Sequence, residues 1–143
     1  MTWERTAGAS SAAPPQRVWE VLLDGRRWSL WNPAVEWMAV EAALEPGGLV
    51  TFKPRGGRQT AFRIEAVQPG RLLALAVRFG PVATMRLRWE LAPEAGGTTV
   101  VQTVGIGGPL AGLLLRRPAE RIADAMPANL ARLAVRAVAL APA

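Results

Sequence analysis

The sequence contains no cysteine, no histidine and no tyrosine, and Lys53 is its one lysine. Without cysteine, the chain has neither a disulfide framework nor a thiolate nucleophile. Without histidine, it lacks the commonest general base, so a Ser-His-Asp triad and a His-ligated metal site are both excluded. Only carboxylates, arginines, hydroxyls and Lys53 remain for catalysis, and we expect no metal and no cofactor.

Long apolar runs and clusters of one charge are also missing. No run approaches the roughly 20 apolar residues of a membrane-spanning helix, and the opening MTWERTAGAS has no apolar core of a secretory signal. We therefore expect a cytoplasmic protein without a transmembrane segment. The net charge is +6, but the basic residues are scattered, with acidic residues between them. This scatter argues against nucleic-acid binding.

The chain does have enough apolar residues for a core. It has 143 residues, half of them hydrophobic, and no repeat or linker divides it. A chain of this length buries roughly 68–70% of its unfolded surface. We expect one domain, 1–143, that is a monomer or a homodimer.

The apolar spacing changes along the chain and predicts the order strand, two short helices, six strands, long helix. Trp3–Ala9 is the first expected strand. A short amphipathic helix begins at Pro14-Pro15, and a second short helix or turn spans Arg26–Trp31 before Asn32-Pro33. The six further strands, each bounded by turn residues, are expected at Val35–Leu44, Leu49–Lys53, Ala61–Val67, Arg71–Phe79, Ala83–Leu91 and Thr98 to about Val104.

The last part of the chain has a helical period. One apolar stripe is formed by Ile122, Met126, Leu130, Leu133 and Ala137. Pro118 and Pro127 predict a kink or restart near Pro118 and allow another near Pro127. A curved antiparallel sheet buries its concave face only against another element, and this helix is the one able to cover it. The space between them need not be completely packed, so a ligand cavity is expected there.

Several segments resemble a known family in the family's own order. They are RVWEVLLDGRRWSLWNP (17–33), LEPGGLVTF (44–52), IEAVQPGRLLAL (64–75), RLRWELAPEAGGTTV (86–100) and GGPLAGLLL (107–115). Together they are similar to the polyketide cyclase/dehydrase (SRPBCC) family of START-like helix-grip proteins. The resemblance implies an α+β fold: a curved seven-stranded antiparallel sheet around a long C-terminal helix, with two short helices after strand one. It also implies a cavity for lipids, polyketides or other apolar molecules, but no catalytic residue set.

The candidate pocket residues are mostly apolar. Trp28 and Trp31 are expected near the cavity mouth, where they could stack on a flat ligand, and Asn32 could bond a ligand carbonyl or merely form a turn. Gln102 points inward in one strand register and into solvent in the other. The remaining candidates would line the pocket or form ordinary core: Met38, Met85, Leu87, Trp89, Ile122, Met126 and Leu130.

The charged residues of the strands and the glycine-rich stretch before the last helix are given structural rather than functional roles. Strand alternation places most of Glu36, Arg63, Arg78, Arg86 and Arg88 in solvent. The glycine-rich stretch 105–112 fits neither a dinucleotide fingerprint nor a P-loop.

Three functional hypotheses follow. The first is binding of a small hydrophobic molecule (lipid, polyketide or aromatic) in an internal cavity. The alternative is a polyketide cyclase or dehydratase that uses the same cavity, with its catalytic residues unknown. A module acting at an acidic lipid surface or on nucleic acid is the third. The sequence leaves open whether the protein is an enzyme.

Overall fold

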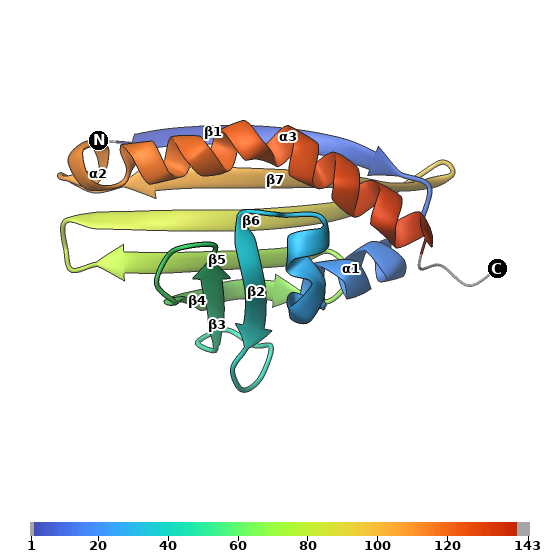
Figure 1. Cartoon of the computed structure of the whole chain (residues 1–143), viewed down its shortest axis with the longest axis horizontal. Coiled ribbons are helices and arrows are strands. Elements are labelled where there is room, and N and C mark those ends of the chain that lie inside the picture. The colour runs from blue at the N-terminus through green and yellow to red at the C-terminus, as the bar shows by residue number, and fades with distance from the viewer. Residues whose placement is uncertain (1, 140–143) are drawn as a thin grey trace.

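A seven-stranded antiparallel sheet curls around a long helix in the computed structural model, which describes residues 2–139 (Figure 1). The strand order is β1-β7-β6-β5-β4-β3-β2. This is the helix-grip α+β fold expected from the sequence. The elements in chain order are β1 (Thr2–Ser11), α1 (Pro15–Leu23), the 3-10 helix η1 (Gly25–Leu30), β2 (Val35–Val40), β3 (Leu49–Pro54), β4 (Thr60–Gln68), β5 (Leu72–Phe79), β6 (Ala83–Glu94), β7 (Gly97–Gly107), α2 (Ala111–Leu114) and α3 (Arg116–Ala139).

Strand alternation decides which face of the sheet is buried. In β6, Met85, Leu87 and Trp89 are buried, whereas the intervening Arg86 and Arg88 are exposed. Successive side chains of a strand point to opposite faces, so the apolar set faces the helices and the arginines face away. The expected outward orientation of these arginines is confirmed.

Several strand boundaries differ from the sequence expectation; β6, for example, extends to Glu94 rather than Leu91, and β7 to Gly107 rather than about Val104. β1 is longer than Trp3–Ala9, because it pairs with β7 continuously from Thr2 opposite Gly107 to Ser11 opposite Thr98. β2 ends at Val40 instead of Leu44. The expected strand Val35–Leu44 was too long, because the chain turns at 43–48, where the Glu45 N–H donates to the Ala43 carbonyl and Gly47 has a φ of +89°.

The C-terminal helical region restarts where the prolines predicted a break. The short helix α2 ends at Leu114 and α3 begins at Arg116, which places Pro118 in the first turn of α3. N–H groups in a first turn have no partner within the helix, so proline costs little there. Pro127, in contrast, lies inside the continuous α3.

Helix α3 packs against β1, β7 and α1. Its buried face contains four alanines, Ala119, Ala123, Ala134 and Ala137, beside Met126, Leu130 and Leu133. The Ser11 hydroxyl donates to the Ala134 carbonyl at 2.8 Å and joins β1 to this helix. Ile122, expected in the buried stripe, is only partly buried at the edge of the core; the small side chains Ala119 and Ala123 take the inner positions of that turn. Within residues 2–139, no helix has both the length and the apolar character needed to cross a bilayer.

Candidate functional site

An aromatic cluster occupies the interior between the sheet and the helices. Trp28 from η1 lies at its centre. Its ring centroid is 4.6 Å from that of Trp31, 5.1 Å from that of Phe52 in β3 and 5.8 Å from that of Trp89 in β6. Phe62 in β4 extends the cluster, in edge contact with Phe52 at 5.3 Å. Inclined and edge-to-face contacts of this kind are favourable for aromatic rings.

The position of Trp28 is fixed by its own hydrogen bond and by a close backbone approach. Its indole Nε1 donates to the Leu22 carbonyl at 2.8 Å. At the start of η1, a Cβ atom on Gly25 would overlap the carbonyl oxygen of Met38 in β2. Only glycine therefore allows η1 to approach β2 this closely. This approach holds η1 with Trp28, and Trp31 directly after it, against the sheet.

The indole N–H groups of the other two tryptophans in the cluster, unlike that of Trp28, have no acceptor. Trp31 and Trp89 are each 1% exposed. Among residues 2–139, their indole Nε1 atoms are the buried side-chain nitrogens or oxygens without a hydrogen-bond partner. A buried donor without an acceptor costs about 1–3 kcal/mol. The interior therefore contains two N–H donors that are available to an acceptor.

Gln102 takes the inward of its two possible registers. It lies opposite Trp89 of β6 and Ala7 of β1, and it is 5% exposed. No side-chain hydrogen bond joins it to another residue of the described part of the chain. Its amide is thus a polar group on the apolar inner face, next to one of the two unpaired indoles.

The structure places the predicted pocket residues as follows. Nine of them are buried: Trp28, Trp31, Met38, Met85, Leu87, Trp89, Gln102, Met126 and Leu130. Asn32 and Ile122 are only partly buried. The backbone of Asn32 forms a turn, in which its N–H donates to the Trp28 carbonyl at 2.7 Å and its carbonyl accepts from Val35 at 3.1 Å. Ligand contact by these residues stays a prediction.

Sequence reasoning missed Phe52, Phe62, Asn129 and Arg132. The alternation of Val50 and Phe52 was a signal for an inward Phe52. Asn129 and Arg132 could not be found in this way, because they depend on how α3 meets η1. Arg132 donates to the Asn129 side-chain oxygen at 3.0 Å and to the Trp31 carbonyl at 3.5 Å, which links α3 to the end of η1.

The buried polar side chains of the described residues are Ser11, Thr51, Thr98, Gln102 and Asn129. None of these five is ionisable in the physiological range. The Ser11 and Thr98 hydroxyls already donate to backbone carbonyls, at 2.8 Å each. The polar groups left on the inner face are therefore neutral hydrogen-bonding groups, not acids or bases.

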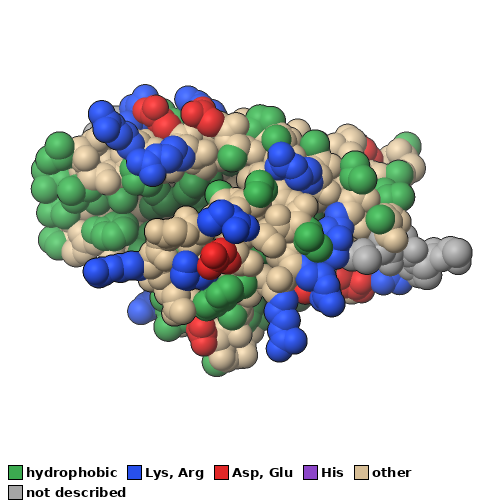
Figure 2. Space-filling view, viewed as in Figure 1, with side chains coloured by type: hydrophobic (Ala, Val, Ile, Leu, Met, Phe, Trp, Pro, Cys, Tyr) green, Lys and Arg blue, Asp and Glu red, His purple; other side chains and the backbone are tan. Residues whose placement is uncertain are grey.

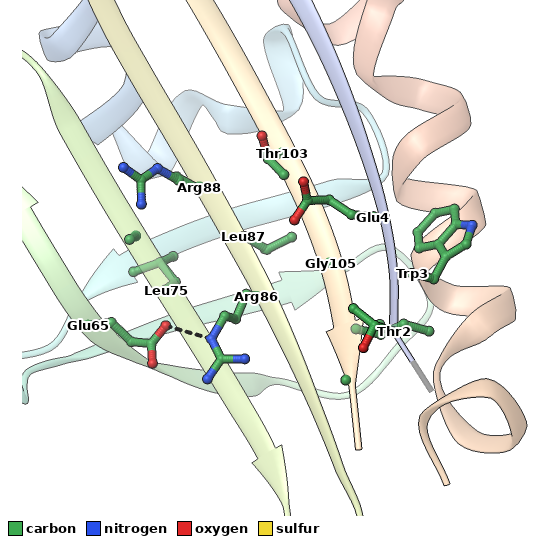
Figure 3. Close-up of a pocket in the computed structure, with 13 residues that line it drawn as sticks. Thr2, Trp3, Glu4, Glu65, Leu75, Arg86, Leu87, Arg88, Thr103 and Gly105 are labelled. Carbon is green, nitrogen blue, oxygen red and sulfur yellow. Dashed lines mark hydrogen bonds and ion pairs between the residues drawn. The ribbon is translucent and has the colours of Figure 1, made fainter. Parts of the chain in front are cut away.

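Two hollows lie on the other face of the sheet, turned away from α1 and α3, and Figure 3 shows the first of them. The first has a volume of about 360 Å³ and includes Glu65, whose carboxylate accepts from Arg86 at 3.1 Å, together with Arg88 and Thr103. The second, of about 490 Å³, shares Glu65 and includes Arg63 and Arg78. These hollows do not coincide with the predicted pocket, because that pocket was expected on the opposite, inner face of the sheet.

Comparison with protein families gives a match over nearly the whole chain. The model described as "Polyketide cyclase / dehydrase and lipid transport" matches residues 3–137. No curated protein matches the chain significantly.

Solved structures with the same fold are numerous. The ZhuI aromatase/cyclase from Streptomyces sp. R1128 is 19% identical with a TM-score of 0.71, and the alignment covers 96% of this chain and 94% of that one. TTHA0849 from Thermus thermophilus is 22% identical with a TM-score of 0.70, covering 98% and 100%. Ara h 8.0201 is 12% identical with a TM-score of 0.71, covering 97% and 99%. At these identities the similarity shows the fold alone.

Proposed function

The chain belongs to the polyketide cyclase/dehydrase and lipid transport family, and from this premise we propose that it binds a small hydrophobic molecule between the inner face of its sheet and α3. The observation that carries the proposal is the pair of buried, unpaired indole N–H groups of Trp31 and Trp89. A folded chain gains nothing from two donors that it leaves unsatisfied. A ligand with a hydrogen-bond acceptor would satisfy them.

The surroundings of these donors indicate the shape of the ligand. Trp28, Trp89 and Phe52 present aromatic faces and edges to one another, and such surfaces favour a flat, conjugated or aromatic molecule. We therefore propose an aromatic or polyketide-like compound that carries a carbonyl group. Gln102, beside Trp89, supplies a further polar contact.

Ligand binding at the two indoles requires the interior to rearrange, because both indole nitrogens are buried. Three methionines, Met38, Met85 and Met126, lie in the same core. Methionine side chains are unbranched and change rotamer at low cost, so they suit a pocket that opens as the ligand binds. Trp28, fixed by its bond to Leu22, would keep its place.

Binding without chemistry is favoured over catalysis by the character of the buried polar groups. General acid–base catalysis needs a group that titrates near the working pH, and the buried polar side chains of the described residues are hydroxyls and amides. Cyclisation of a polyketide is the second candidate, since an aromatase/cyclase shares the fold. In that case the two indoles and Gln102 would stabilise a developing enolate oxygen.

A matched pair of ligands tests the proposal. 2-Acetylnaphthalene and 2-ethylnaphthalene share a ring system and differ in one carbonyl. We expect the wild-type protein to bind the ketone about three- to tenfold more tightly, as one net hydrogen bond provides. In Trp31→Phe or Trp89→Phe this ratio is expected to fall toward one. Equilibrium dialysis measures both affinities for each protein, and the ratio cancels general losses of packing.

Trp28→Phe is the control, because the Trp28 indole already bonds the Leu22 carbonyl. It should keep the wild-type ratio even if both affinities fall. If neither compound binds the wild-type protein, nor any of a panel of fatty acids and polyketide aromatics, the proposed function is wrong. Equal affinity for the two naphthalenes would show that the protein binds hydrophobic molecules but that the indoles do not bond the ligand carbonyl.

A further inference from the structure

One end of the molecule exposes an apolar tip, formed by Phe79, Leu110, Leu113 and Leu114. Leu113 is 82% exposed and the other three side chains are 43–47% exposed. Figure 1 places α2 and the β5–β6 turn at the same end, and Figure 2 shows hydrophobic side chains gathered over that end. Single exposed leucines are ordinary on a protein surface, but neighbouring ones indicate contact with a partner.

The backbone of the apolar tip is held in place by a hydrogen bond and by buried neighbours. The Leu110 N–H donates to the Val82 carbonyl in the β5–β6 turn at 2.9 Å, which holds the start of α2 against the sheet. Ala111 and Leu115, on either side of the exposed leucines, are buried. The buried residues anchor the segment, so Leu113 and Leu114 are held outward by the structure around them.

Unpaired arginines flank the apolar tip. Arg78 precedes Phe79 at the end of β5, and Arg117 and Arg121 lie in the first two turns of α3. All three are exposed, and none forms an ion pair with another residue of the described ranges. Arg116, in contrast, is paired with Glu120 and stacks over Trp3. Three free positive charges thus border exposed leucines at one end of the molecule.

We propose that the apolar tip docks on the surface of an anionic lipid bilayer. Exposed leucines enter the boundary between headgroups and acyl chains, while flanking arginines bind the acidic headgroups. A second copy of this chain fits less well, because a two-fold contact through the tip would bring Arg117 and Arg121 of both copies together. The inference goes beyond the proposed function and stands without it.

The docking orientation has a consequence for ligand exchange. Figure 2 shows the surface hollowed between α3 and the strands below it, beside the apolar tip and with hydrophobic side chains on its visible wall. A molecule docked through this tip would hold the hollow next to the bilayer. If the proposed function also holds, an apolar ligand would pass between membrane and protein with little exposure to water.

Vesicle sedimentation tests the docking surface. We expect the full chain to bind vesicles of phosphatidylcholine with about 30% phosphatidylglycerol, and to bind pure phosphatidylcholine vesicles at least about tenfold more weakly. Leu113→Asp is expected to weaken binding to the anionic vesicles about tenfold or more, because it removes a leucine side chain that enters the bilayer on docking. Arg117→Gln and Arg121→Gln should each weaken it about fivefold.

Matched controls lie elsewhere on the surface. Val135→Asp changes an apolar side chain that is 70% exposed on α3, away from the apolar tip, and Arg26→Gln removes an exposed arginine of η1. Both should bind anionic vesicles as the wild-type protein does. Equal binding to both lipid mixtures, or unchanged binding by Leu113→Asp, would overturn the proposal. So would light scattering that shows a dimer broken by Leu113→Asp, since the tip would then bind a second copy. The naphthalene affinities separate these outcomes from a failure of the ligand site.

Discussion

Trp28→Ala is expected to lower the free energy of unfolding by about 4 kcal/mol, in the range for truncation of a large buried aromatic side chain. Trp28 is 1% exposed and contacts the rings of Trp31, Phe52 and Trp89. The substitution removes those contacts together with the indole hydrogen bond to Leu22. A loss of this size is a large fraction of the total stability of a small domain, which is about 5–15 kcal/mol.

Equilibrium unfolding in urea, followed by far-ultraviolet circular dichroism, measures the change without depending on tryptophan emission. Leu30→Ala is the matched control in the same short helix. Its side chain is 57% exposed, so we expect a change within about 0.5 kcal/mol. A loss below about 1 kcal/mol for Trp28→Ala would show that the cluster is not the centre of the core.

Gly25→Ala is expected to destabilise the protein by about 3 kcal/mol, although it adds only one methyl group. Gly-to-Ala substitutions without a clash commonly stabilise, by about 0.4–1 kcal/mol, because the unfolded chain loses freedom. At position 25 the added Cβ would overlap the Met38 carbonyl oxygen, and backbone cannot move aside as a flexible side chain does. Helix η1 must then shift away from β2, at the cost of strained packing.

Gly107→Ala is the control, since a Cβ at that position meets no atom within 4 Å. It should leave the urea midpoint nearly unchanged. Near-ultraviolet circular dichroism adds a second readout: the tryptophan signals should change in Gly25→Ala because η1 positions Trp28 and Trp31, and they should not change in Gly107→Ala. If the free energy of unfolding of Gly25→Ala lay within about 1 kcal/mol of the wild-type value, the packing of η1 on β2 would be loose enough to accept a methyl group.

Much of the fold could be predicted from local patterns. The clean alternation of β6 identified both its strand and its inner face, and proline positions located the restart before α3. The errors lie where a boundary depends on a partner strand. The end of β2 at Val40 and the extension of β1 to Ser11 follow from pairing with β3 and β7, which a local pattern does not contain.

The residue types of the candidate site could be predicted from the sequence, but the hydrogen bonding of its tryptophans could not. Apolar spacing placed Met38, Trp89 and Met126 inside, and the structure buries all three. No sequence pattern could show that Trp28 finds a backbone acceptor whereas Trp31 and Trp89 do not. That difference depends on the relative position of η1, the sheet and α3, which is set by the close approach at Gly25 and by the Arg132 bonds.

The pairing of β1 with β7 has a consequence for how the chain reaches its fold. These strands are neighbours in the sheet, yet one spans residues 2–11 and the other residues 97–107. During synthesis the first strand is made long before its partner, and it has no sheet edge to join until most of the chain has emerged. Contacts between such distant segments are slow to form because a long loop must close first. The β2–β6 meander can pair progressively as it is made, so we infer that closure of β1 onto β7, followed by docking of α3, is the late step of folding.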